Sequence, residues 1–236
     1  HLLWSLHSRI MPNWIAPAVP PFFCLMAAFW NERMRLAKPF FAIGLVLGIF
    51  VVVLMHQSNL IGRITGEPLP GEMDPLRRVR GWQPAAALVE NAREKLAADG
   101  QPTFIICGHY GITGLFTFYS PPARRALQSP QPLVYSIDSD TPANQFYFWP
   151  EYDYRATRKG QNAIYVTQAG LDRLEPGWFW KWLKHEPIQR TPPPVETLPP
   201  RIAREFNSVT DLGERDVKLG NRTFQRLHLW ACYGLK

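Results

Sequence analysis

The chain has 236 residues, of which 46% are hydrophobic and 19% charged, and its formal net charge is +7. Residues 1–56 contain four basic residues and one acidic residue, whereas residues 57–236 contain 22 basic and 18 acidic residues. A surplus of four charges on the longer part is too small for a nucleic-acid-binding surface, and no DNA- or RNA-binding motif accompanies it. We therefore expect no nucleic acid among the partners.

The run Pro39–Met55 contains no charged and no strongly polar side chain. It is apolar on every face, whereas a helix on the surface of a globular protein keeps one polar face. Seventeen residues rise roughly 25 Å as a helix, close to the hydrocarbon thickness of about 30 Å. The pattern favours a membrane span over about 38–56, with a fully buried core helix as the alternative.

A second apolar run, Trp14–Trp30, is also about as long as a membrane is thick. Its three prolines would break a helix in water but are tolerated in spans, where neighbouring helices satisfy the backbone. Tryptophan at both ends is typical of the membrane–water interface. The sequence thus predicts a second span over about 14–30, and residues 1–56 form a membrane region.

The connection Asn31–Lys38 carries three basic residues and one acidic residue. Because basic loops stay in the cytoplasm, this loop is expected there and residues 57–236 on the opposite side of the cytoplasmic (inner) membrane. Basic residues beside a membrane also suit lipid phosphate. Since the sequence begins at His1 within apolar sequence, we expect a piece of a longer, multi-pass protein.

Residues 57–81 are rich in glycine and proline and are predicted to be a linker, with a basic cluster near its end. Residues 82–236 show the pattern of an extracytoplasmic α/β domain, because short buried strands alternate with helical stretches. The expected helices are 82–98, 112–119 and 201–206. The expected strands are 103–107, 133–137 and 163–167, followed by a hairpin of 216–219 and 222–233 around Gly220-Asn221.

An aromatic and proline-rich insert, 170–200, interrupts this pattern. Trp178–Lys184 combines large apolar side chains with two lysines, which suits the headgroup region of a bilayer. The insert either enters that region, covers the mouth of a site or packs onto its own domain.

Three cysteines are present, and their spacing shows no metal site. Cys107 and Cys232 fall in predicted strands and are expected to be free thiols, with a disulfide between them as the alternative. No other cluster of metal-ligating residues stands out, so no metal is expected.

His109 and Tyr110 follow a buried strand directly. The carboxyl end of a central strand is where α/β sheets bind ligands, although a single histidine is at least as often structural. The glycines from Gly108 to Gly114 have the spacing GxxGxxG, which differs from the dinucleotide fingerprint GxGxxG. We therefore expect no nucleotide, and the cofactor is unknown.

Two further groups of residues suit recognition of a sugar or of its carrier. The loop that begins at Asn144 and Gln145 and contains Trp149 is rich in amides and aromatic rings, which suit sugars, or else it covers the sheet. Arg9, Asn13 and Trp14 combine a cation, an amide and an interfacial aromatic ring, although Arg9 also fits a headgroup anchor.

Several short motifs resemble those of the bacterial family 39 glycosyltransferases, which are related to protein O-mannosyltransferases and aminoarabinose–lipid A transferases. The stretch Arg9–Ala18 (RIMPNWIAPA) is similar to a segment late in the membrane part of that family. The order of the soluble motifs is similar too, except over 170–200. These motifs are Asp74-Pro75, Gly81-Trp82, His109-Tyr110, Phe118-Tyr119, Asn144-Gln145, Trp149-Pro150 and Gly160–Ala163.

The resemblance implies a multi-span GT-C enzyme of the cell envelope that uses a polyprenyl-phosphate sugar donor and a lipid or glycan acceptor. The family's catalytic carboxylate lies in the first extracytoplasmic loop, so no catalytic residue is expected in this chain. The implied substrate-binding residues are the three groups described above, namely Arg9, Asn13 and Trp14; His109 and Tyr110; and Asn144, Gln145 and Trp149. The alternative is a membrane-anchored, non-enzymatic domain that binds a glycan or a protein.

Overall fold

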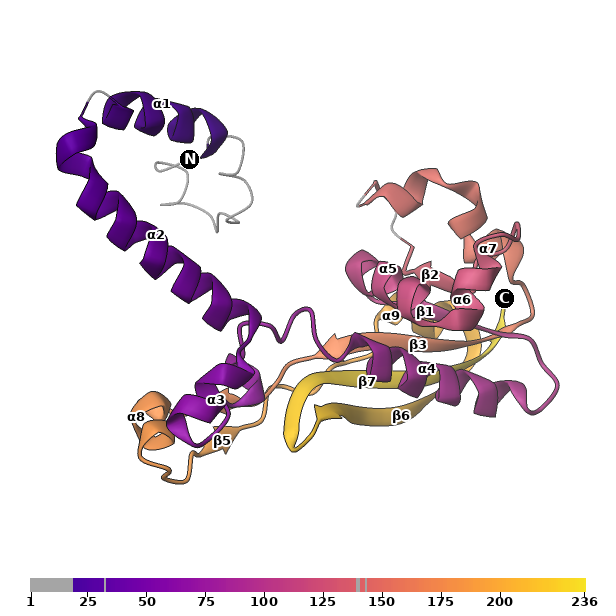
Figure 1. Ribbon diagram of the computed structural model, residues 1–236. Coiled ribbons are helices and arrows are strands. Elements are labelled where there is room, and N and C mark those ends of the chain that lie inside the picture. Colours follow the sequence, from indigo (N-terminus) through magenta and orange to yellow (C-terminus); the bar gives the residue numbers. More distant parts are fainter. Residues whose placement is uncertain (1–18, 32, 139–140, 143) are drawn as a thin grey trace. The chain divides into compact units, whose positions relative to one another are not determined.

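The computed structural model describes residues 19–31, 33–138, 141–142 and 144–236 (Figure 1). The chain divides into two compact units, residues 1–56 and residues 57–236. Each unit is described by itself.

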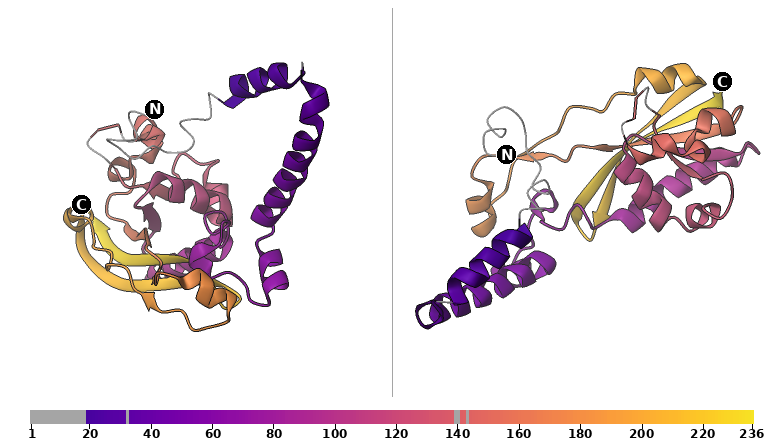
Figure 2. Two further views of the ribbon diagram at one scale, coloured as in Figure 1. Left: turned by 90° about the vertical axis from the view of Figure 1, so that its left-hand side faces the viewer. Right: turned by 90° about the horizontal axis from the view of Figure 1, so that it is seen from above.

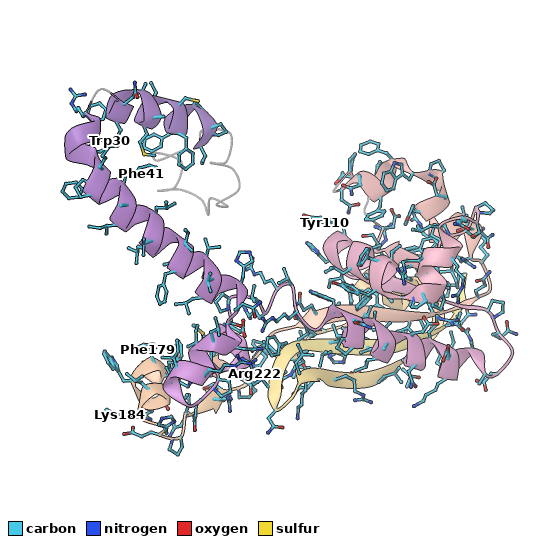
Figure 3. All side chains as sticks on the ribbon, viewed as in Figure 1. Trp30, Phe41, Tyr110, Phe179, Lys184 and Arg222 are labelled. Carbon is cyan, nitrogen blue, oxygen red and sulfur yellow. The ribbon has the colours of Figure 1, made fainter. Side chains whose placement is uncertain are left out.

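The first unit contains helix α1, Val19–Asn31, and helix α2, Met34–His56. Within α2, the 19 residues from Lys38 to His56 have a mean hydropathy of 2.4, and none of their side chains is buried. This is the one helix in the described residues that is long and apolar enough to cross a membrane. The 13 residues of α1 are too few, so a second span is not shown. Trp30 and Phe41 line an apolar cleft of about 310 Å³ in this unit (Figure 3).

The second unit is built on a mixed five-stranded sheet, so the α/β class is confirmed. The strands are β1 (Thr103–Cys107), β2 (Val134–Ser136), β3 (Asn162–Ala169), β6 (Phe206–Leu219) and β7 (Arg222–Leu235), in the order β2-β1-β3-β7-β6. Strand β1 is parallel to β2 and β3, and β7 is antiparallel to β3 and β6. Ile105 stands opposite Val134 on one side and Ile164 on the other.

Helices cover both faces of this sheet. One face packs on α4 (Trp82–Ala97), α5 (Tyr110–Tyr119) and α6 (Pro121–Ala126), and its core includes Val89, Ile105, Phe116, Val166 and Leu229. The opposite face packs on α7 (Tyr154–Thr157) and α9 (Pro200–Glu205), with Phe104, Tyr135, Tyr165, Ile202 and Trp230 in its core. Successive residues of a strand alternate between these two cores, as the period of two requires.

The hairpin β6–β7 forms a long curved ribbon (Figures 1 and 2). Its turn lies at Gly220, φ +61°, as the sequence predicts. The sequence prediction for its first strand, 216–219, was too short, because β6 spans 14 residues from Phe206. Strand β6 is an edge strand with mostly polar, exposed residues, and its register shifts between Asp211 and Gly213. It therefore lacks the apolar alternation that marks a half-buried strand.

Residues 57–81 are folded rather than extended as a linker. They contain helix α3 (Asn59–Thr65) and a 3₁₀ helix, η3 (Gly71–Met73), which packs on β7. The Asp74 carboxylate has no exposed surface and accepts hydrogen bonds from Ser58 Oγ at 2.8 Å and Arg222 Nη1 at 3.2 Å. A Cβ on Gly71 would lie 2.1 Å from the carbonyl oxygen of Thr223, so the two segments touch directly.

The insert 170–200 contains a two-stranded sheet and one short helix. Strands β4 (Arg173–Leu174) and β5 (Arg190–Thr191) flank helix α8 (Trp178–Leu183). Elsewhere, Cys107 and Cys232 are buried free thiols, as predicted. Burial raises the pKa of Cys107, and it raises the pKa of Cys232 to about 12.

Candidate functional site

Gly108 fixes the path by which the chain leaves β1. A Cβ at this position would lie 2.7 Å from Thr167 Cγ2 and 2.8 Å from Tyr165 Oη, closer than real side-chain contacts allow. The Gly108 amide donates to the Val166 carbonyl at 2.9 Å, which extends the β1–β3 pairing by one residue. Glycine is therefore required here for close packing, and the next residue has a defined position at the carboxyl end of the sheet.

That next residue, His109, is the N-cap of α5. Its Nδ1 accepts a hydrogen bond from the Gly111 amide at 3.0 Å, so the histidine has the structural role that the sequence left open as an alternative. Since Nδ1 is an acceptor, the neutral ring carries its proton on Nε2. The ring is exposed and stacks on Tyr110 with a centroid distance of 4.3 Å. Its Nε2–H remains available as a donor.

His109 lines a cleft of about 620 Å³ outside the carboxyl ends of β1 and β3. The connection that follows β1 packs on one face of the sheet, and α7, which precedes β3, packs on the other. A crevice at such a change of face is the usual ligand site of an α/β sheet. The polar and charged residues that line it are Arg77, Arg78, His109, Gln168, Glu196 and Gln225.

Hydrogen bonds hold the amides of this cleft in place. Gln168 Nε2 donates to Gln225 Oε1, and Gln225 Nε2 donates to the carbonyl oxygens of Arg77 at 2.5 Å and Arg80 at 3.3 Å. Amide, imidazole, guanidinium and carboxylate groups together offer donors and acceptors to a polar ligand with several hydroxyl groups. The arrangement can therefore bind and orient such a ligand through hydrogen bonds.

Five of these six lining residues were not predicted as site residues. Arg77 and Arg78 were noted in the sequence only as part of a basic cluster in the expected linker. Gln168 is the last residue but one of β3, Gln225 lies in β7, and Glu196 lies in the proline-rich insert. A cluster of basic residues next to Gly81-Trp82 was the one signal available, because the remaining residues meet only through the sheet topology.

The predicted amide and aromatic loop lies beside the neighbouring strand, β2. Asn144 is the N-cap of a 3₁₀ helix, η4 (Gln145–Phe148), and accepts from the Phe146 amide at 3.0 Å. Gln145 is exposed. Trp149 packs edge-on against Phe146, with centroids 5.4 Å apart, and against Tyr152 of η5 (Pro150–Tyr152).

Through these rings the loop covers part of the sheet, which is the alternative interpretation of its aromatic residues. Tyr152 packs against Tyr135 of β2 at 6.1 Å between centroids. The hollow between Asn144 and the end of β2 holds only about 20 Å³, too little for a sugar ring. Tyr147 and Phe148 nevertheless stay exposed beside Trp149.

The structure does not join all the predicted site residues into one site. Among the described residues, no hydrogen bond or ring contact links His109 or Tyr110 to Asn144, Gln145 or Trp149. Tyr110 lies at the start of α5 (Figure 3). Arg9, Asn13 and Trp14 lie outside the described residues.

Within the part of the chain that the structure describes, no group of three or more His, Cys, Asp or Glu side chains could hold a metal ion. No protein-family model, curated protein or solved structure matches the chain.

Proposed function

We propose that this chain is the C-terminal part of an integral-membrane glycosyltransferase of the GT-C type. It transfers a sugar from a polyprenyl-phosphate donor to a lipid or glycan acceptor at the outer face of the cytoplasmic membrane. The resemblance to family 39 glycosyltransferases is the reason for naming sugar transfer. The structural support is an exposed apolar helix that is followed along the chain by an α/β unit with a polar cleft.

The observation that carries the proposal is the exposure of α2. Its large apolar side chains are exposed all around the helix, including Phe40, Phe41, Ile43 and Val53. Nineteen residues rise roughly 28 Å, which matches the hydrocarbon core of a bilayer. Leaving such a helix in water would be costly, because each large side chain contributes about 1.5–3 kcal/mol when it is buried. A bilayer is the surrounding that stabilises it.

The proposed orientation rests on the three basic residues of the stretch 31–38, around the start of α2. They favour a cytoplasmic connection between the spans 14–30 and 38–56, which places residues 57–236 outside the cytoplasm. A polyprenyl-phosphate donor presents its sugar at the same membrane surface.

In this enzyme the α/β unit binds and orients, and the catalytic carboxylate belongs to an upstream loop. His109, Gln168 and Glu196 offer hydrogen bonds to sugar or acceptor hydroxyl groups in the cleft. Arg9 and Asn13 hold the lipid phosphate at the membrane surface. Negative charge grows on that phosphate as the glycosidic bond breaks, so a guanidinium there stabilises the transition state more than the ground state.

The test is sugar transfer by the full-length protein in vesicles supplied with polyprenyl-phosphate hexoses and pentoses. Arg9→Ala is expected to lower turnover about 100- to 1000-fold, the usual effect of losing one such contact. Arg9→Lys should recover part of it, since lysine keeps the charge but loses the bidentate geometry. His109→Ala should raise the KM for the acceptor, whereas Gln128→Ala, at an exposed position outside the cleft, should change nothing.

Orientation is checked in intact cells that contain the full-length protein, with an impermeant thiol reagent and the variant Ser129→Cys at an exposed position. Reaction only after lysis of intact cells would contradict the extracytoplasmic assignment. Glycan binding without transfer from any donor, by folded protein, would overturn the enzyme proposal. That result would favour the membrane-anchored binding domain, to which the exposed rings of Tyr147, Phe148 and Trp149 would be suited.

A further inference from the structure

Helix α8 has two unlike faces. Trp182 is buried, whereas Phe179, Trp180 and Leu183 are 45%, 64% and 42% exposed, and Lys184 is exposed with them. At about 100° per residue, these four exposed side chains occupy one continuous arc of about 140°. The two exposed aromatic rings alone leave on the order of 200 Å² open.

Contacts on the other side fix α8 to the segment that follows α3. Trp182 Nε1 donates to the Pro68 carbonyl at 3.1 Å, and His185 Nδ1 lies 3.3 Å from a Glu67 carboxylate oxygen. Lys181 Nζ reaches both carboxylate oxygens of Glu175 at 2.9 Å, so this lysine belongs to the insert's own packing. Phe179 and Lys184 lie away from these contacts, on the outer side of α8 (Figure 3). The exposed arc is therefore held in place on its inner side, where the Phe179 ring also packs on Trp182 with centroids 5.8 Å apart.

Chain length keeps this arc close to the end of α2. Pro68 follows His56 by twelve residues, and seven of these form α3. A seven-residue helix rises roughly 10 Å, and five further residues span at most about 17 Å. The point to which α8 is bonded thus lies within roughly 30 Å of the end of the membrane helix, whatever the arrangement of the two units.

We propose that the exposed face of α8 is a second membrane-contact site, which enters the headgroup region of the bilayer that α2 crosses. Tryptophan and phenylalanine bind such an interface when they lie beside a lysine that, like Lys184, has no ion pair in the described part of the chain. The rings enter the acyl boundary and the ammonium group meets lipid phosphate. Arg63 and Ile64 of α3 are exposed next to this segment and add a further cation and a further apolar group. The inference rests on the membrane position of α2, and it adds a contact that holds the α/β unit at the membrane surface.

The experiment measures the depth of a nitroxide on the full-length protein in vesicles of phosphatidylethanolamine and phosphatidylglycerol. In a Cys24→Ser background, the label is attached to Trp180→Cys or, independently, to Leu183→Cys. The buried Cys107 and Cys232 are checked for labelling with the background protein alone. Phe50→Cys in α2 gives the lipid reference, and Leu127→Cys, an exposed apolar position at the end of α6, gives the aqueous reference.

The measured quantity is the ratio of the nitroxide's collision rate with oxygen to its collision rate with a water-soluble nickel complex. At residues 180 and 183 this ratio should lie between the values at residue 50 and residue 127. Lys184→Glu should shift the ratio toward the aqueous value, because it places like charge against anionic lipid. A ratio equal to that of residue 127 at both positions overturns the inference. If the labelled protein transfers sugar but gives the aqueous ratio at both positions, only the α8 contact is refuted. If α8 is immersed but the protein transfers no sugar, only the proposed function is refuted.

Discussion

The Asp74 cluster offers the sharpest test of how the α/β unit is held together. The Asp74 carboxylate accepts hydrogen bonds from Ser58 Oγ, the Leu76 amide and the Arg222 guanidinium. Arg80 Nη1 lies 3.8 Å away. It joins three segments far apart in the chain. The replacement Asp74→Asn keeps the shape but removes the one negative charge that faces two guanidinium groups.

Breaking a buried ion pair on one side costs about 3–5 kcal/mol. The carboxylate is fully buried, but the side chains of Arg222 and Arg80 keep about a fifth of their surface in water. Partial hydration of the two cations favours the lower end of this range, so we expect Asp74→Asn to lower the free energy of unfolding by about 3 kcal/mol. For a unit of this size each kcal/mol lowers Tm by about 2–4 °C, which gives a decrease of roughly 6–12 °C.

The assays are urea unfolding and thermal unfolding of the full chain in detergent, both monitored by tryptophan fluorescence. Asp99→Asn is the matched control, because Asp99 is exposed at the end of α4 and has no ion pair among the described residues. The double variant Asp74→Asn, Arg222→Gln should be less destabilised than the sum of its single variants, by about 0.5–3 kcal/mol. A cost for Asp74→Asn no larger than that of Asp99→Asn would refute the reasoning.

Two further predictions concern close packing and acid stability. Gly108→Ala should cost about 1–3 kcal/mol of stability, because its methyl group would collide with Thr167 and Tyr165, whereas Gly114→Ala, with open space around it, should be neutral or stabilising in the same thermal unfolding assay. The hydrogen bond from Arg226 holds the pKa of Asp216 below its usual value, although partial burial opposes this. Ionised Asp216 therefore stabilises the fold above about pH 4, and this stabilisation is lost as the pH falls through the pKa of the folded state. The urea concentration at the unfolding midpoint should therefore fall less steeply as the pH is lowered in Arg226→Gln than in the parent. An equal dependence on pH in the two proteins would contradict this.

The sheet could be predicted where its strands are short, apolar and buried. Strand β1 has the bounds that the sequence indicates, and β3 differs from its prediction by a few residues. The polar edge strand β6 has no such signal, so its length depends on pairing with β7 along the whole hairpin. Local sequence cannot show this, because the partner supplies the hydrogen bonds that make a polar stretch extended.

The candidate site was predictable only in its first residue. His109 follows a strand that the sequence marks clearly, and its place at the strand's carboxyl end follows from the fold class. Arg77 and Glu196, which line the same cleft, are 119 positions apart in the sequence. Arg77 is placed there because its carbonyl accepts from Gln225 of β7. Such a position depends on tertiary contacts, which neither composition nor periodicity encodes.

These contacts give residues 57–81 a role in the cleft that a linker would not have. Ser58 comes two residues after α2, and its hydroxyl donates to the buried Asp74. Asp74 in turn accepts from Arg222, three positions before Gln225 on the strand that supports Arg77. The charged cluster and the cleft thus share supporting residues on β7, so loosening Asp74 should disturb ligand binding in the cleft as well as stability.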